Sequence, residues 1–133
     1  RYSKRSIGGG GGAESIVLLD TVGELMTVYS FSTVALVCGS LVPGIGGHNL
    51  LEPAYFSKPV VYGAHLTTYL GMAEMLEAAG GGVRAADGEL GAVLKRLLGD
   101  ATARKTMGAN AKRVVEENRG AAARTVEVIE RFL

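Results

Sequence analysis

The residues best suited to chemistry lie in the run 38–54, which reads CGSLVPGIGGHNLLEPA. This composition is typical of a strand end, a glycine-rich loop and the start of a helix. Glycines let the backbone approach a ligand closely, and the first turn of a helix presents unpaired N–H groups that bind anions. Glu52 stands in that first turn, where a carboxylate can accept hydrogen bonds from two sugar hydroxyls. The run therefore indicates a site for the phosphate and the ribose of a nucleotide.

The phosphate has four backbone candidates, which are Gly46, Gly47, His48 and Asn49. The alternative is a tight strand-to-helix turn that needs glycine only for its positive φ angles. Ser40 can donate its hydroxyl to the same phosphate, or it can simply end the strand. The ring of His48 has three possible roles: a general base, a phosphate donor or a packing residue of the turn. We assign His48 to binding.

The spacing of Asn49 and Glu52 is also that of a capping box, a hydrogen-bonded motif at helix starts. In that motif Asn49 accepts from an amide of the first turn, and Glu52 folds back onto the N–H of the cap residue. The two interpretations of Glu52 are compatible, because it can cap the helix when the site is empty and bind ribose when it is filled.

Two further loops offer residues that could line the same pocket. Asp20, Thr21 and Glu24 flank a turn; the alternative is that Asp20 or Thr21 caps the next helix, with Glu24 near its positive end. His65 follows a strand and is expected to point toward the same crevice, or else to be a hydrogen-bonded structural residue. Two histidines and one cysteine give no spacing typical of a metal site, so we expect no metal and no cofactor.

Short apolar strands alternate with helices in the elements that must position these residues. The sequence predicts strands at 16–19, 34–37, 59–62 and 82–85, and helices at 23–30, 49–56, 69–79, 88–98, 101–118 and 121–132. Continuous apolar strands of this kind are typical of a parallel sheet with helices on both faces. We therefore predict a Rossmann-like α/β fold. Its ligands bind beyond the carboxyl ends of the strands, where Asp20 and the loops after Val37 and Tyr62 are expected.

Length and composition restrict the class of protein. With 133 residues and 47% apolar residues, the chain is long enough for one globular domain. We divide it into a basic, glycine-rich flexible segment, 1–15, and a Rossmann-like domain, 16–133. The single cysteine, Cys38, excludes an internal disulfide, and at the end of an apolar strand it is expected to be buried and inert. Basic residues do not cluster with aromatic ones, which argues against nucleic-acid binding.

The run 38–54 resembles the Kdo transferases, bacterial enzymes that transfer 3-deoxy-D-manno-octulosonic acid (Kdo) from CMP-Kdo to lipid A precursors. Their pattern here is close to Gly-Gly-Ser-Leu-Val-Pro-x-Gly-Gly-His-Asn-Pro-Leu-Glu-Pro-Ala. The likeness continues in the segments 20–25 (DTVGEL), 58–60 (KPV), 63–65 (GAH) and 117–121 (ENRGA). It therefore extends over nearly the whole chain from Val17 onward.

This chain departs from the family pattern at several positions. The loop is one residue longer, because Gly44 and Ile45 both lie between Pro43 and Gly46. Single residues also differ: Cys38 replaces a glycine, Leu50 and Ala64 replace prolines, and Thr68 replaces an asparagine.

The resemblance implies a fold and a function. The fold is the C-terminal part of a GT-B glycosyltransferase, so that 16–133 is a nucleotide-sugar-binding domain. The function is to bind CMP-Kdo through Ser40, Gly46, Gly47, His48, Asn49 and Glu52, with no catalytic residue in this chain. The acceptor, a lipid A precursor of lipopolysaccharide biosynthesis, and the membrane anchor belong to an absent N-terminal part. The whole enzyme is expected at the cytoplasmic face of the bacterial inner membrane, whereas this chain is expected to be soluble and inactive alone.

A second interpretation is a non-catalytic α/β interaction module that keeps the fold without a complete site. The longer loop and the absence of upstream strands motivate it. The same absence predicts an unpaired apolar sheet edge, through which the chain could self-associate.

Overall fold

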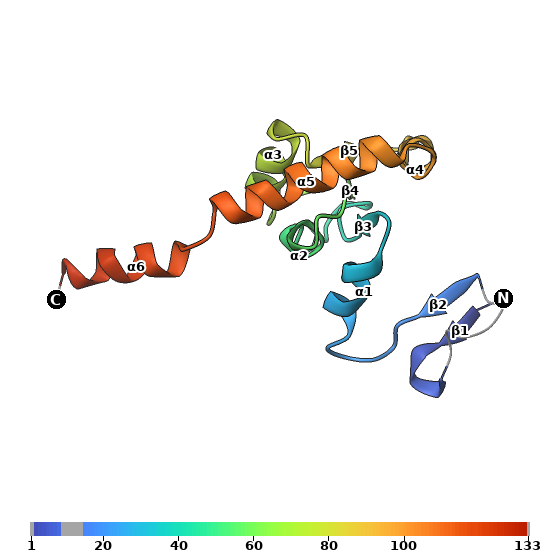
Figure 1. The fold of residues 1–133 in the computed structure, drawn as a ribbon, viewed down its shortest axis with the longest axis horizontal. Helices are drawn as coiled ribbons and strands as arrows, with labels where there is room; N and C mark the ends of the chain where they lie inside the picture. Colours follow the sequence, from blue (N-terminus) through green and yellow to red (C-terminus); the bar gives the residue numbers. More distant parts are fainter. Residues whose placement is uncertain (1, 9–14, 133) are drawn as a thin grey trace. The chain divides into compact units, whose positions relative to one another are not determined.

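The computed structural model of the chain describes residues 2–8 and 15–132, and for 121–124 only the backbone. The chain divides into two compact units, Arg1–Ser32 and Thr33–Leu133 (Figure 1). Each predicted helix is present, with bounds that differ from the prediction by at most two residues.

The first unit contains a two-stranded parallel sheet, a short 3-10 turn and one helix. Its elements are β1 (Tyr2–Lys4), η1 (Arg5–Ile7), β2 (Ile16–Leu18) and α1 (Leu25–Phe31). β1 and β2 pair from Tyr2 opposite Ile16 to Lys4 opposite Leu18. All three side chains of β2 are between 47% and 61% exposed, so this strand is held mainly by its backbone hydrogen bonds.

The predicted strand at 16–19 is therefore present, but it belongs to a different sheet from the one expected. It pairs with β1 and not with the strands of the second unit, because residues 2–4 offer it a free hydrogen-bonding edge. The structure also differs from the expected flexible segment 1–15, since residues 2–4 are a strand. Most of the glycine run lies outside the described residues.

The second unit is built on a parallel sheet with the strand order β3 (Ala35–Val37), β4 (Val60–Gly63) and β5 (Gly82–Ala85). Five helices follow or separate the strands: α2 (Leu51–Tyr55), α3 (Leu70–Ala78), α4 (Leu90–Gly99), α5 (Ala101–Glu117) and α6 (Ala121–Glu130). β4 lies between the other two strands and is buried along its whole length. This arrangement is the predicted α/β layer structure.

Two apolar clusters lie on the two faces of this sheet. Successive side chains of a strand point to opposite faces, and the strand β4 follows this rule. Val60 and Tyr62 pack in the cluster with α2, α3 and α5, whereas Val61 packs in the cluster with α4. The predicted covering of both faces by helices is thus confirmed.

Tyr62 is the largest fully buried side chain of the core. Its hydroxyl lies 3.1 Å from the carbonyl oxygen of Ala73 and 3.2 Å from Oε1 of Glu77, which also pairs with Arg84. Burial raises the pKa of the Tyr62 phenol, and the carboxylate of Glu77 raises it further. The phenol therefore stays neutral and serves as a donor within the core.

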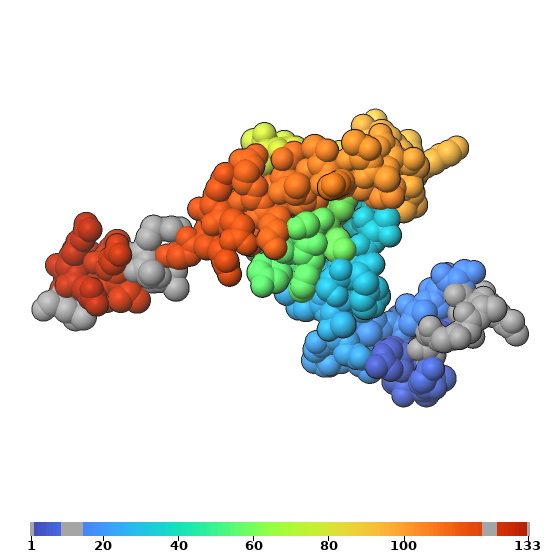
Figure 2. Space-filling view, in the orientation of Figure 1, coloured from blue at the N-terminus to red at the C-terminus, as the bar shows by residue number. Residues whose placement is uncertain are grey.

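The helix α5 packs against the short helix α2 through backbone contacts (Figures 1 and 2). Gly108 of α5 lies directly against the carbonyl of Ser57, which follows α2, and a Cβ at this position would overlap that carbonyl oxygen. Ser57 itself has a φ of 58°, which leaves its loop little freedom to move. Only glycine fits at position 108.

We expect Gly108→Ala to lower the free energy of unfolding by about 2 kcal/mol. The added methyl group would overlap the carbonyl oxygen of Ser57, a backbone atom that has no other rotamer to adopt. Gly91→Ala in α4 is the matched control, since a Cβ there meets open space and alanine favours the helix by up to about 1 kcal/mol. Urea denaturation of both variants measures the effect. Equal stability of the two variants would contradict this account of the α2–α5 contact.

Candidate functional site

The candidate site lies at the carboxyl edge of the parallel sheet in the second unit. β3 ends at Val37, β4 at Gly63 and β5 at Ala85, and each is followed by a loop. Because parallel strands end at the same edge, these three loops are neighbours in space. The loop 38–50 carries the glycines, the loop 64–69 carries His65, and the loop after β5 carries Asp87.

Ser40 joins two of these loops and is fully buried. Its hydroxyl donates to the carbonyl of Val37 (3.2 Å) and accepts from the amide of Gly63 (2.8 Å). Its own carbonyl accepts from the amide of His65 at 2.9 Å. A hydroxyl has one proton, so this geometry leaves none for a phosphate. Of the two roles considered for Ser40, the structural one is realised, and Ser40 is removed from the candidate ligands.

The glycine loop is shaped by residues with positive φ angles. Gly39, Gly46 and Gly47 have φ values of 81°, 85° and 92°, a region in which other residues are strained. The amide of Gly47 donates to the carbonyl of Gly39 at 3.0 Å. This amide is therefore used inside the turn, as the alternative interpretation required. The amides of His48 and Asn49 make no hydrogen bond within the part of the chain that the structure describes, so they are free to bind an anion. Gly46 is buried and closes the turn at 43–45.

His48 is held against the start of the loop. Its Nδ1 lies 2.7 Å from the carbonyl oxygen of Cys38, and a Cβ on Gly39 would overlap the ring. A carbonyl only accepts, so we assign the ring proton to Nδ1. The neutral ring then has no proton on Nε2. His48 is thus a packing residue of the turn, and it can donate to a phosphate through Nε2 only when the ring is charged.

Cys38 is exposed, which corrects the expectation of a buried thiol. β3 ends one residue earlier, at Val37. The side chain of Cys38 therefore belongs to the loop and leaves the core.

Asn49 and Glu52 interact, but not as a capping box. Oδ1 of Asn49 accepts from the amide of Leu51 at 3.0 Å, and its Nδ2 donates to Oε1 of Glu52 at 3.3 Å. The expected bond from the backbone amide of Asn49 to Glu52 does not occur. The side chain of Asn49 instead accepts from the amide two residues ahead, and its Nδ2 donates to the carboxylate in place of the backbone amide. Glu52 is half-buried, and its Oε2 has no partner among the described residues. One carboxylate oxygen thus remains free to accept from a sugar hydroxyl.

His65 lies at the same edge of the sheet. Its Nε2 is 3.6 Å from Oδ1 of Asp87, which follows β5, and its amide is bound by Ser40. His65 is therefore both a hydrogen-bonded structural residue and a neighbour of the glycine loop. Asp87 was not among the residues predicted for the site; its position two residues after the predicted strand 82–85 was the available signal.

Asp20, Thr21 and Glu24 belong to the first unit, where they hold that unit together. Asp20 accepts from the hydroxyl (2.7 Å) and the amide (2.9 Å) of Ser6, and these two bonds lower its pKa. The hydroxyl of Thr21 donates to Glu24, which lowers the pKa of that carboxyl, and Arg5 pairs with Glu24 at 3.0 Å. Of the two interpretations of this turn, the helix cap is not observed, since neither Asp20 nor Thr21 caps α1. These residues bind other parts of their own unit instead.

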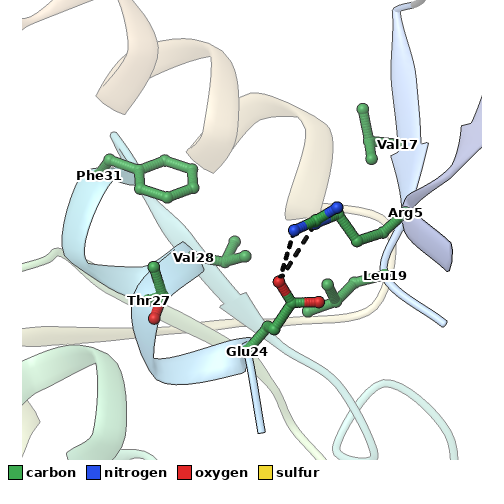
Figure 3. Close-up of a pocket in the computed structure, with 7 residues that line it drawn as sticks. All are labelled: Arg5, Val17, Leu19, Glu24, Thr27, Val28 and Phe31. Carbon is green, nitrogen blue, oxygen red and sulfur yellow. Dashed lines mark hydrogen bonds and ion pairs between the residues drawn. The ribbon is translucent and has the colours of Figure 1, made fainter. Parts of the chain in front are cut away.

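Glu24 also lines a cavity of about 460 Å³ within the first unit. Its walls are mostly apolar, and the ion pair of Arg5 and Glu24 crosses one side of it (Figure 3). Its lining residues are Arg5, Val17, Leu19, Glu24, Thr27, Val28 and Phe31.

Metal binding and membrane spanning also bear on the wider function. Nowhere in residues 2–8 and 15–132 do three potential metal ligands gather. Among the helices of the same residues, none has the length and apolar character needed to cross a bilayer.

The parallel sheet, its two helical faces and the glycine loop at its carboxyl edge define a Rossmann-like α/β domain. No protein-family model matches the chain. It is 36% identical over 120 residues to the 3-deoxy-D-manno-octulosonic acid transferase of Haemophilus influenzae. This match covers 89% of this chain and 28% of that protein. It is 33% identical over 135 residues to the same enzyme of Bordetella pertussis, with coverages of 99% and 31%.

A solved structure agrees with these relatives. The C-terminal CMP-Kdo binding domain of WaaA from Acinetobacter baumannii matches with a TM-score of 0.78 and 28% identity, over 86% of this chain and 60% of that one. Over most of its own length the chain is therefore similar to the Kdo transferases. It spans less than a third of the length of the two enzymes compared above.

The buried hydrogen bonds of Ser40 generate a prediction about stability. Ser40→Ala leaves the amide of Gly63 and the carbonyl of Val37 buried without this partner, so we expect the free energy of unfolding to fall by about 1–3 kcal/mol. Cys38→Ala, an exposed position in the same loop, is the control and should be nearly neutral. Chemical denaturation of both variants is the measurement. A loss of stability below about 0.5 kcal/mol for Ser40→Ala would show that the hydrogen bonds of the Ser40 hydroxyl do not stabilise the fold.

Proposed function

We propose that this chain is the CMP-Kdo-binding part of a glycosyltransferase, which transfers Kdo to a lipid A precursor in lipopolysaccharide biosynthesis. The observation that carries the proposal is the presence of free amides at His48 and Asn49 together with the free Oε2 of Glu52, whose other oxygen is bonded to Asn49. The likeness to a CMP-Kdo binding domain supports it.

In this proposal the phosphate of the donor lies against the free amides of His48 and Asn49. Charge develops on this phosphate as CMP leaves, and fixed N–H groups stabilise such charge without moving. Glu52 accepts from the ribose hydroxyls, while Asn49 holds its other oxygen in place. Because α2 has only five residues, the individual N–H groups carry this role and a helix dipole adds little.

The remainder of the whole enzyme supplies what these residues do not. We place the general base, the lipid A precursor and the attachment to the membrane in its N-terminal part, at the cytoplasmic face of the bacterial inner membrane. Transfer would then be an inverting displacement at the anomeric carbon, with no catalytic residue from this chain, which would be inactive alone.

The second candidate is a non-catalytic interaction module with the same fold. One observation favours it: the turn uses the amide of Gly47 and the hydroxyl of Ser40 for itself, which reduces the number of possible phosphate ligands. Binding of CMP separates the two candidates.

We expect the chain to bind CMP, and Glu52→Ala to weaken that binding at least tenfold, because hydrogen bonds to a charged group are worth about 1.5–3 kcal/mol. Isothermal titration calorimetry with CMP, and with UMP for comparison, measures the effect. Glu74→Ala, an exposed carboxylate on α3, is the matched control and should bind as the wild type does. If the folded wild-type chain binds no CMP, or if Glu52→Ala binds CMP equally well, the proposed site is wrong.

We further propose that the chain self-associates through β3. Among the described strands β3 pairs only with β4, so its other edge has unpaired backbone groups. Light scattering over a range of concentrations should show a mass that rises above that of the monomer. A constant monomer mass at high concentration would exclude this association.

A further inference from the structure

The loop 64–69, between β4 and α3, contacts the glycine loop 38–50 directly. The amide of Thr67 donates to the carbonyl of Gly46 at 3.2 Å. Beneath this contact, the side chain of Leu66 is buried against Gly47, where an added Cβ would lie 2.6 Å from its Cδ2. Together with the bonds to Ser40, these contacts fix the loop 64–69 beside the candidate phosphate site.

Two threonine hydroxyls point toward the glycine loop from this neighbouring loop. A Cβ on Gly46 would overlap Oγ1 of Thr67 and would lie 3.3 Å from Oγ1 of Thr68. Both threonines are exposed, and neither hydroxyl makes a hydrogen bond with any described residue. Two free donors therefore lie next to Gly46, at the start of the segment that carries the free amides of His48 and Asn49.

The surrounding groups favour an anionic ligand at these hydroxyls. The nearby free backbone groups are N–H donors, and the carboxylate of Asp87 lies 3.6 Å from the ring of His65. One oxygen of Glu52 accepts from Asn49, and the other stays free for the ribose. Hydrogen bonds to an ionised oxygen are about twice as strong as those between neutral groups. An oxyanion in this position would accept from both loops at once.

We propose that Thr67 and Thr68 form a second wall of the donor site, and that their hydroxyls donate to an anionic oxygen of the bound donor. This inference rests on the proposed function. The anionic oxygen belongs either to the phosphate or to the carboxylate of the sugar, and the two sources share the same chemistry. The glycine at position 46 is then required for ligand access as well as for its φ angle, because any side chain there would fill the space beside the hydroxyls.

The test compares Thr67→Val, Thr68→Val and the double variant, which keep the shape of threonine and remove the hydroxyl. Titration calorimetry with cytidine, CMP and CMP-Kdo measures binding to the full chain. We expect each single variant to bind CMP or CMP-Kdo about five- to tenfold more weakly, from the net strength of one hydrogen bond, and cytidine equally well. Thr67→Ser, which retains the hydroxyl, should bind almost as the wild type does. Thr106→Val, exposed on α5, is the control for the substitution itself.

The compounds distinguish the sources of the anion. A loss for both CMP and CMP-Kdo assigns the phosphate to the hydroxyls, and a loss for CMP-Kdo alone assigns the carboxylate. Unchanged binding of both by the double variant would overturn the inference and leave the proposed function standing, as would an equal loss for cytidine. Absence of binding by the folded wild-type chain would remove the proposed function and this inference together.

Discussion

The candidate site depends on the buried contact between the loops that follow β3 and β4. Ser40 makes three hydrogen bonds there, and Gly63 has no side chain because a Cβ would overlap the carbonyl of Ser40. Buried polar groups are costly unless they are paired, so these bonds allow two polar loops to lie against each other at the end of an apolar sheet. The free amides, the threonine hydroxyls and Glu52 all take their positions from this contact.

The apolar core supports the contact from below. Because neighbouring residues of β4 pack on opposite faces, one strand joins the clusters under α2, α3 and α5 and under α4. The end of this strand at Gly63 is therefore held from both sides. A loop that begins at a fixed point and is bonded to its neighbour keeps its donors in place before a ligand arrives, which lowers the entropic cost of binding.

The sequence was sufficient for the elements of the second unit and for the place of the site. Apolar runs such as 60–62 predict buried strands, and glycines followed by Asn49 and Glu52 mark a turn into a helix. The pairing of β2 was not predictable in this way, because a short apolar run fits either sheet. The partner of a strand depends on which edges are free, and a sequence pattern does not contain that information.

Individual hydrogen bonds within the site were also beyond sequence reasoning. The spacing of Asn49 and Glu52 fits a capping box, yet a shift of one residue in the start of α2 gives a different set of bonds. Ser40 fits a ligand by its position, and only its burial shows that its proton is already used. The roles of Thr67 and Thr68 arise from a contact between loops some twenty residues apart in the chain.

The backbone contacts of α5 have a consequence for the evolution of this domain. Gly108 lies against the carbonyl of Ser57, and a Cβ on Gly81 would lie 2.5 Å from the amide nitrogen of Ala111, so α5 is fixed at two points one turn apart. Backbone atoms have no rotamers, and they stay the same when side chains are exchanged. As long as Gly81 and Gly108 are retained, the depth of α5 over the sheet therefore does not depend on the other side chains of the helix, and its outer face can vary in sequence while the carboxyl edge keeps its geometry.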